Sequence, residues 1–129
     1  MRILLDTHVW LWMLSDPGKL RDSAREVLEA RESELHLSAA SAWEIAIKYR
    51  LGKLPLPEEP ALFVPKRLER DGVRPLPISH AHALAEAGLP PHHRDPFDRL
   101  LVAQARVEGL VLCTVDPMIG RYDVETLRA

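Results

Sequence analysis

The sequence predicts an α/β fold, a three-layer α/β/α sandwich with a mostly parallel central sheet. Strand-like apolar runs alternate with helical patterns along the chain, which is typical of parallel sheets covered by helices. Two runs, at residues 3–5 and 110–115, are apolar almost throughout, as expected of strands buried on both faces. They lead directly into Asp6 and Asp116, and we expect the first run to be the middle strand of the sheet. Because parallel strands point their carboxyl ends to one edge of the sheet, we expect both aspartates there.

The predicted elements follow from turn, cap and proline signals. Thr7 is a candidate cap for the first helix, and Gly52 and Gly88 are placed as helix stops. Pro65 weakens the helical pattern around it, because an interior proline kinks or breaks a helix. In order, we expect strand 3–5, helix 8–14, turn 16–18, helix 22–30, strand 34–38, helix 39–51, loop 53–60, helix 61–70, edge strand 73–77, helix 80–87, loop 89–96, helix 97–106, strand 110–115, helical turn 117–122 and edge strand 124–127.

Length and composition limit the classes of protein to consider. At 129 residues the chain is predicted to form one domain, residues 1–129, with enough core to fold without disulfides or structural metals. Its hydrophobic fraction of 47% and charged fraction of 28% argue against disorder. A formal net charge of −2 argues against coating nucleic acid by bulk charge, although it leaves room for a local basic rim.

The remaining compositional features concern location and redox chemistry. The single cysteine, Cys113, lies within an apolar run and is expected to be a core side chain rather than a reactive thiol. Asp6 and His8 interrupt the N-terminal apolar residues, which argues against a signal peptide. No run approaches the ~18 apolar residues of a membrane span. We therefore expect a cytoplasmic protein without membrane association.

Four carboxylates are candidates for one pocket. Asp98 lies in the first turn of its predicted helix, and Glu44 lies one turn into the helix that follows the second strand. Parallel topology would gather both near Asp6 and Asp116. Like charges in one cleft repel, so such a cluster normally holds cations, and oxygen ligands alone favour Mg²⁺ or Mn²⁺. Ions of this kind support phosphodiester hydrolysis by an in-line displacement.

Each acid also has a purely structural interpretation. Asp6 is a common type of helix cap, and on its own this interpretation is the better one. Asp98 gains from the positive end of its helix dipole, and Ser41 to Glu44 has the spacing of a capping box. The common position of all four acids at the ends that parallel topology gathers favours a metal site.

The motifs around these acids resemble the PIN domain and, more narrowly, VapC-type toxins of type II toxin–antitoxin systems. The resemblance covers the whole chain in order, and its most specific part is the stretch Asp95 to Ala105. It rests on Leu4-Leu5-Asp6-Thr7, Ser41-Ala42-Trp43-Glu44-Ile45, Asp95-Pro96-Phe97-Asp98-Arg99-Leu100-Leu101-Val102-Ala103-Gln104-Ala105 and Thr114-Val115-Asp116. It implies a Mg²⁺- or Mn²⁺-dependent endoribonuclease whose catalytic and metal-binding residues are Asp6, Glu44, Asp98 and Asp116.

The resemblance also implies partners, namely an RNA substrate, a cognate antitoxin and a second copy in a homodimer. Trp10, Leu11, Trp12 and Met13 exceed what a short helix can bury against one sheet, which suggests a groove for a partner. In the resembled family an antitoxin occupies such a groove and presents a basic side chain to the acids.

Other residues near the motifs receive weaker predictions. Thr114 is expected to support the pocket through its hydroxyl, and Asp95 to fix its loop rather than bind metal. His92 and His93 could form a transition-metal site or supply a general acid. Adjacent histidines in a proline-rich loop are more often exposed to solvent, so neither is assigned a role.

Basic residues flank the predicted pocket. Arg94 and Arg99 are candidates for contacts with RNA phosphates, although Arg99 could equally pair with a carboxylate. Lys48, Arg50 and Lys53 form another possible phosphate rim, with a solvated surface as the alternative.

A rival interpretation is a non-catalytic α/β signalling or RNA-binding domain with an acidic cation-binding pocket. A phospho-receiver would carry a carboxylate pair after its first strand and a lysine after a late one. Here Thr7 follows Asp6, and Pro117 follows Asp116, so the pattern does not match. The absence of G-x-G-x-x-G argues against dinucleotide binding.

Overall fold

A five-stranded, fully parallel sheet forms the centre of the computed structural model, which describes residues 1–129. The strand order is β3-β2-β1-β4-β5. The strands are β1 (Arg2–Leu5), β2 (Glu34–Ser38), β3 (Arg74–Leu76), β4 (Val111–Thr114) and β5 (Thr126–Arg128). Every pairing is parallel. This confirms the predicted fold class and places β1 in the middle, as expected of the strand that precedes Asp6.

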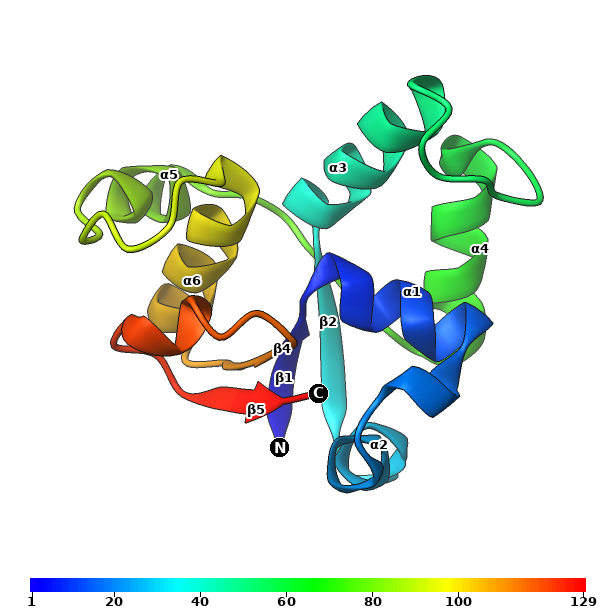
Figure 1. Cartoon of the computed structure of the whole chain (residues 1–129), viewed down its shortest axis with the longest axis horizontal. Coiled ribbons are helices and arrows are strands. Elements are labelled where there is room, and N and C mark those ends of the chain that lie inside the picture. The colour runs from blue at the N-terminus through cyan, green and yellow to red at the C-terminus, as the bar shows by residue number, and fades with distance from the viewer.

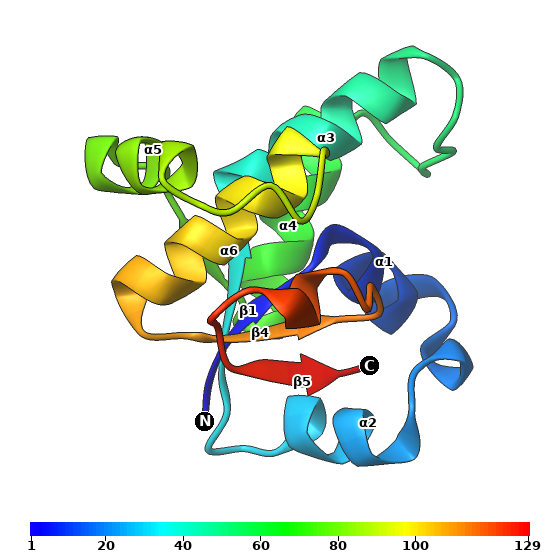
Figure 2. The same ribbon diagram turned by 60° about the vertical axis from the view of Figure 1, so that its left-hand side comes forward.

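Helices cover both faces of the sheet (Figures 1 and 2). One side carries α1, α2 and α4, and the other carries α5 and α6, while α3 extends from the carboxyl end of β2 (Figure 1). The helices are α1 (Thr7–Ser15), α2 (Asp22–Glu29), α3 (Ala39–Arg50), α4 (Pro60–Asp71), α5 (His80–Ala87) and α6 (Pro96–Glu108). Two short 3₁₀ turns lie at Pro17–Lys19 and Ile119–Arg121. No helix has both the length and the apolarity that crossing a bilayer requires.

The central strand divides the core into two layers. Ile3 and Leu5 pack with Trp10 in one buried cluster, whereas Leu4, between them, packs with Leu101 in the other. All five side chains are at most 1% exposed. The alternation follows from the two-residue period of a strand, and burial on both faces explains why β1 is apolar throughout.

The register of β1 with β4 sets the position of the site. Leu5 pairs with Cys113, and the backbone N–H of Asp6 donates to the Cys113 carbonyl at 2.9 Å. The two strands therefore end side by side, and the chain continues from them into Asp6 and Asp116. Cys113 is fully buried, as predicted, and burial raises the pKa of its thiol to about 12.

Two capping predictions were wrong. Thr7 is already the first residue of α1, and its hydroxyl donates to Ser41 Oγ at 2.8 Å instead of capping the helix. Ser41 does not begin a capping box either, because α3 starts at Ala39, where Ser38 Oγ accepts from the Ala40 N–H. In both cases the helix begins directly at the end of the preceding strand, one or more residues earlier than the local pattern predicts.

Proline and the last strand account for the other differences. Helix α4 continues through Pro65, which lies on its exposed side. The carbonyl four residues earlier, on Ala61, loses its helical donor but belongs to an exposed residue, so water can satisfy it. The final strand spans Thr126–Arg128, two residues later than the predicted start.

Candidate active site

Asp6 and Asp116 are linked by the hydroxyl of Thr114. Thr114 Oγ1 donates to Asp6 Oδ2 at 2.8 Å and accepts from the Asp116 N–H at 3.0 Å. Asp6 occupies the position before the first residue of α1, but its side chain makes no capping hydrogen bond. The carboxylate is therefore held by a hydrogen bond from β4 rather than by a capping hydrogen bond to the helix.

Asp98 reaches the same edge of the sheet from the first turn of α6. Its Oδ2 lies 3.2 Å from Nε2 of His93, and the same nitrogen hydrogen-bonds to Asp116 Oδ2 at 2.7 Å. His93, Asp98 and Asp116 thus form a compact cluster whose ligand atoms lie within 4.8 Å of one another. All three side chains are partly buried, at 18%, 19% and 29% exposed respectively.

The backbone of Asp95 determines which nitrogen of His93 carries the proton. The Asp95 N–H donates to His93 Nδ1 at 3.0 Å, so Nδ1 must be the acceptor. In the neutral ring the proton then lies on Nε2, which faces Asp98 and Asp116. A metal-binding histidine normally has the opposite arrangement, with its second nitrogen donating to a carbonyl or carboxylate. His93 is therefore set up as a hydrogen-bond donor to the acids rather than as a metal ligand.

Glu44 belongs to the acid group by charge but has its own partner. It is 8% exposed on α3, and its Oε2 lies 2.8 Å from Lys48 Nζ, one turn along the helix. Its negative charge nevertheless contributes to raising the pKa of both Asp6 and Asp98. The structure therefore brings Asp6, Asp98 and Asp116 together, with Glu44 at the margin, neutralised by a lysine.

The pKa values of Asp6, Asp98 and Asp116 reflect their burial, their hydrogen bonds and the negative charges near them. Burial raises the pKa of the Asp98 carboxyl to about 7, and the charges of Asp6 and Asp95 add to the effect. Burial also raises the pKa of Asp6, against the opposing hydrogen bond from Thr114. At Asp116 burial has the same tendency, but the bonds from the Met118 N–H and His93 lower the pKa below its ordinary value. A bound cation would relieve this repulsion.

Arg99 holds the loop that carries His93. Its guanidinium donates to Glu86 Oε1 at 2.7 Å and to the carbonyls of Glu86, Leu89 and Pro90. It also donates to Tyr122 Oη, which in turn accepts the His93 N–H at 2.8 Å. Of the two predictions for Arg99, pairing with a carboxylate is the one confirmed.

Asp95 has the role that the sequence predicts, whereas His93 has one that the sequence does not indicate. Asp95 caps α6 through the Phe97 N–H, in agreement with its predicted role in fixing the loop. His93 was left without a role, yet it contacts two of the four acids. Its position five residues before Asp98, in a loop with three prolines at 90, 91 and 96, was the available signal. Only the folded loop shows that its ring turns inward.

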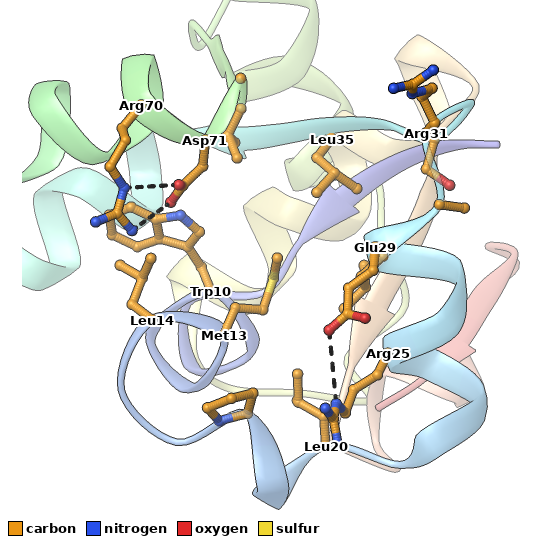
Figure 3. A pocket seen from close by; sticks show the side chains of 16 residues that line it. Trp10, Met13, Leu14, Leu20, Arg25, Glu29, Arg31, Leu35, Arg70 and Asp71 are labelled. Atoms are coloured by element: carbon orange, nitrogen blue, oxygen red, sulfur yellow. Dashed lines mark hydrogen bonds and ion pairs between the residues drawn. The ribbon is translucent and has the colours of Figure 1, made fainter.

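The acid cluster is separate from a large cavity elsewhere in the molecule. That cavity, of about 570 Å³, lies among α1, α2 and the end of α4, on one face of the sheet (Figure 3). Trp10, Met13 and Leu14 contribute apolar surface, and Arg25 and Asp71 lie at its margin. A hollow is therefore present beside α1, where a groove for a partner is predicted. Half of the residues that line it are apolar.

The donor set of the acid cluster fits a hard divalent cation. Asp6, Asp98 and Asp116 offer carboxylate oxygens, while the imidazole that contacts Asp98 and Asp116 presents an N–H. Oxygen ligands select Mg²⁺, Mn²⁺ or Ca²⁺ over softer metals. The raised pKa of Asp98 further indicates that the metal-free pocket holds its charges at an energetic cost.

Comparison with known proteins agrees with the fold and the motifs. The family model of the PIN domain matches residues 3–125. Ribonuclease VapC16 from Mycobacterium tuberculosis (strain ATCC 25618 / H37Rv) is 52% identical over 61 residues, which are 47% of this chain and 43% of that protein. The chain thus aligns with less than half the length of this curated relative.

Solved structures share the fold over nearly the whole chain. VapBC2 from Rickettsia felis, bound to a promoter DNA fragment, has a TM-score of 0.75 at 17% identity and covers 100% of this chain and 99% of that chain. DNA-bound VapBC from Salmonella typhimurium has a TM-score of 0.71 at 16% identity, covering 99% and 98%. VapBC-1 from nontypeable Haemophilus influenzae gives 0.68 at 19% identity, also covering 99% and 98%. At these identities the likeness concerns the fold.

The protonation of His93 can be tested directly. We expect the neutral ring to be protonated at Nε2, because Nδ1 accepts the Asp95 N–H. Long-range ¹H–¹⁵N correlation spectra at alkaline pH distinguish the two nitrogens, and His92 in the same spectrum serves as a comparison. Protonation at Nδ1 would contradict the assigned donor role.

The raised pKa of Asp98, caused by burial and by nearby negative charges, predicts that the stability of the fold depends on pH. Its pKa is raised from 3.8 to about 7 in the folded protein, so the fold binds a proton that the unfolded chain releases. The stabilisation is present below about pH 4 and is lost as the pH rises through about 7. Without metal, Asp98→Asn should melt about 5 °C above the wild type at about pH 8 and close to it at about pH 4. Lower stability of the variant at alkaline pH would show instead that the carboxylate supports the helix.

Proposed function

This chain belongs to the PIN domain family, and from that premise we propose that it is a metal-dependent endoribonuclease and the toxin of a toxin–antitoxin pair. Residues 1–129 would then form a single PIN domain. The relative with 52% identity is named a ribonuclease, and the three compared structures are of VapBC. The activity, the substrate and the partner of this chain are proposals that the following observations support.

The observation that carries the proposal is the geometry of the acid cluster. Carboxylates that follow β1, begin α6 and follow β4 lie together at one edge of the sheet. Burial and like charge raise the pKa of Asp98 to about 7, and a bound cation would offset both effects. The catalytic and metal-binding residues would be Asp6, Glu44, Asp98 and Asp116.

The proposed ion is Mg²⁺ or Mn²⁺. Asp6, Asp98 and Asp116 would hold it, and Glu44 would hold a second ion or a water molecule. When bound, such an ion lowers the pKa of water and neutralises charge on a phosphodiester during hydrolysis. The hard oxygen donors support this choice of metal, as do the raised pKa values of Asp6 and Asp98.

The other residues of the site would orient these acids. Thr114 fixes one oxygen of Asp6 by donating to it, and the His93 N–H holds the adjoining oxygens of Asp98 and Asp116. Lys48 limits the negative charge at Glu44. Each contact leaves further carboxylate oxygens for a cation, so the site is ordered before any ligand arrives.

For the antitoxin we propose the cavity of Figure 3 as the docking site. Its apolar residues suit the apolar face of a partner helix. The partner's Arg or Lys would then compete with the metal for the carboxylates. A homodimer is proposed on the family resemblance alone.

Cleavage and folding should separate in Asp6→Asn. The asparagine can still accept the Thr114 hydroxyl, and it removes a buried charge, so the metal-free fold should be at least as stable as the wild type. Cleavage should fall by at least about 100-fold, because even residues that only orient metal ligands cost that much. Sequencing of RNA 5′ ends after induced expression of each form would identify the target and measure the loss.

Calorimetry provides the control for that experiment. Mg²⁺ should raise the melting temperature of the wild type by mass action, with a smaller effect in Asp6→Asn. Unimpaired cleavage by a folded Asp6→Asn would reject the proposed site. Equal Mg²⁺ effects on both proteins would place the cation elsewhere.

Competition between antitoxin and metal predicts a shifted metal dependence. The preformed complex should need more Mg²⁺ than the free toxin for half-maximal RNA cleavage, because a basic side chain would occupy the carboxylates. Titration of Mg²⁺ with simultaneous measurement of complex integrity checks this. Full activity of an undissociated complex at the Mg²⁺ level of the free toxin would contradict it.

A further inference from the structure

A second cleft lies beside the acid cluster, between α1 and α3, and its charge is opposite. It has a volume of about 390 Å³, and we call it the basic cleft. The residues that define it here are Thr7, His8, Trp12, Lys19, Lys48 and Lys53. The chain has only four lysines, and three of them line this one cleft. No aspartate or glutamate lines it.

The basic cleft begins at the edge of the acid cluster. Thr7 and His8 directly follow Asp6 in sequence, and the charge of His8 counts among the influences that lower the pKa of Asp6. From the opposite wall Lys48 reaches Glu44 at 2.8 Å. A strand bound in the cleft would therefore extend to the proposed catalytic carboxylates.

Two of its lysines are free to bind an anion. Lys19 and Lys53 are exposed and form no ion pair, whereas Lys48 is paired with Glu44 and the fourth lysine, Lys66, with Glu58. Lys19 Nζ lies 5.5 Å from the ring centroid of Trp12, a half-buried side chain in the same cleft. An ammonium group held over an aromatic face is readily exchanged for a stacked base.

Electrostatics favours nucleic acid as the occupant. A phosphodiester approaching four carboxylates is repelled, and the net charge of −2 gives the protein no overall attraction for RNA. Binding then requires positive charge directly beside the acids, and the basic cleft supplies it. Its aromatic residue also suits unpaired bases, which a duplex would keep stacked inside.

We propose that the basic cleft holds the single-stranded RNA next to the scissile phosphate, with Lys19 and Lys53 on backbone phosphates and a base on Trp12. The proposal rests on the proposed ribonuclease function and adds to it the path of the substrate. A base on Trp12 would displace the ammonium of Lys19 from the ring and leave it free for a phosphate.

Binding of a fluorescein-labelled single-stranded oligouridylate tests this path without cleavage. Anisotropy titrations in EDTA, in the Asp6→Asn background, would be repeated over a range of NaCl concentrations. Lys19→Ala/Lys53→Ala should weaken binding at least tenfold and make the plot of log K against log salt shallower by about 1.4, since each single-strand phosphate contact contributes about 0.7. Trp12→Ala should weaken binding about tenfold with an unchanged salt slope, and Trp12→Phe should restore most of it.

Lys66→Ala is the matched control, because it removes one exposed lysine outside the basic cleft. Its affinity and salt slope should equal those of the background protein. Equal binding by the double lysine variant and Lys66→Ala would overturn the proposal. The proposal would also be overturned if the double lysine variant lost binding to a polyglutamate peptide but kept its RNA binding. That result would assign the basic cleft to an acidic protein segment. RNA cleavage by an otherwise wild-type double lysine variant at full rate would overturn the path while leaving the ribonuclease function standing.

Discussion

The crowding of carboxylates at the carboxyl edge of β1 and β4 is the constraint on which the rest of this structure depends. The adjacency of the two strands places Asp6 and Asp116 side by side, and α6 adds Asp98. Burial and mutual repulsion raise the pKa of Asp98 to about 7. A folded protein holds such a cluster by protonating a carboxyl, by placing hydrogen-bond donors beside it or by binding a cation.

Hydrogen-bond donors within the chain hold these acids in place. Thr114 and His93 each contact two parts of the cluster, and the tautomer of His93 is fixed by a backbone N–H rather than by a carboxylate. Arg99, which carries a full charge, binds Glu86 and the Leu89 carbonyl in the loop rather than the acids of the cluster. Asp6, Asp98 and Asp116 therefore stay ordered without a paired Arg or Lys, and of the four acids only Glu44 has a lysine partner, which leaves the three aspartates available to an exchangeable metal.

Helix α1 explains why a short segment carries so many large apolar residues. Trp10, Met13 and Leu14 face the large cavity, while Leu11 and Trp12 face the basic cleft. The helix thus separates a hollow whose lining is half apolar, proposed for a protein partner, from a cationic one, proposed for RNA. Its apolarity on nearly all sides follows from having two hollows and a sheet as neighbours, rather than from burial alone.

The sequence by itself determined the alternation of strands and helices, the central position of β1 and the edge at which the acids emerge, because apolar periodicity and parallel topology are local or general rules. It did not determine the role of His93 or the partner of Arg99, since both depend on how the loop before α6 folds back onto Tyr122. Of the lysines of the basic cleft, Lys48 and Lys53 are close in sequence and are already predicted as a phosphate rim, whereas Lys19 lies far from both. Only the packing of α1 against α3 brings Lys19 to the same surface, because side-chain contacts across elements are decided by tertiary structure.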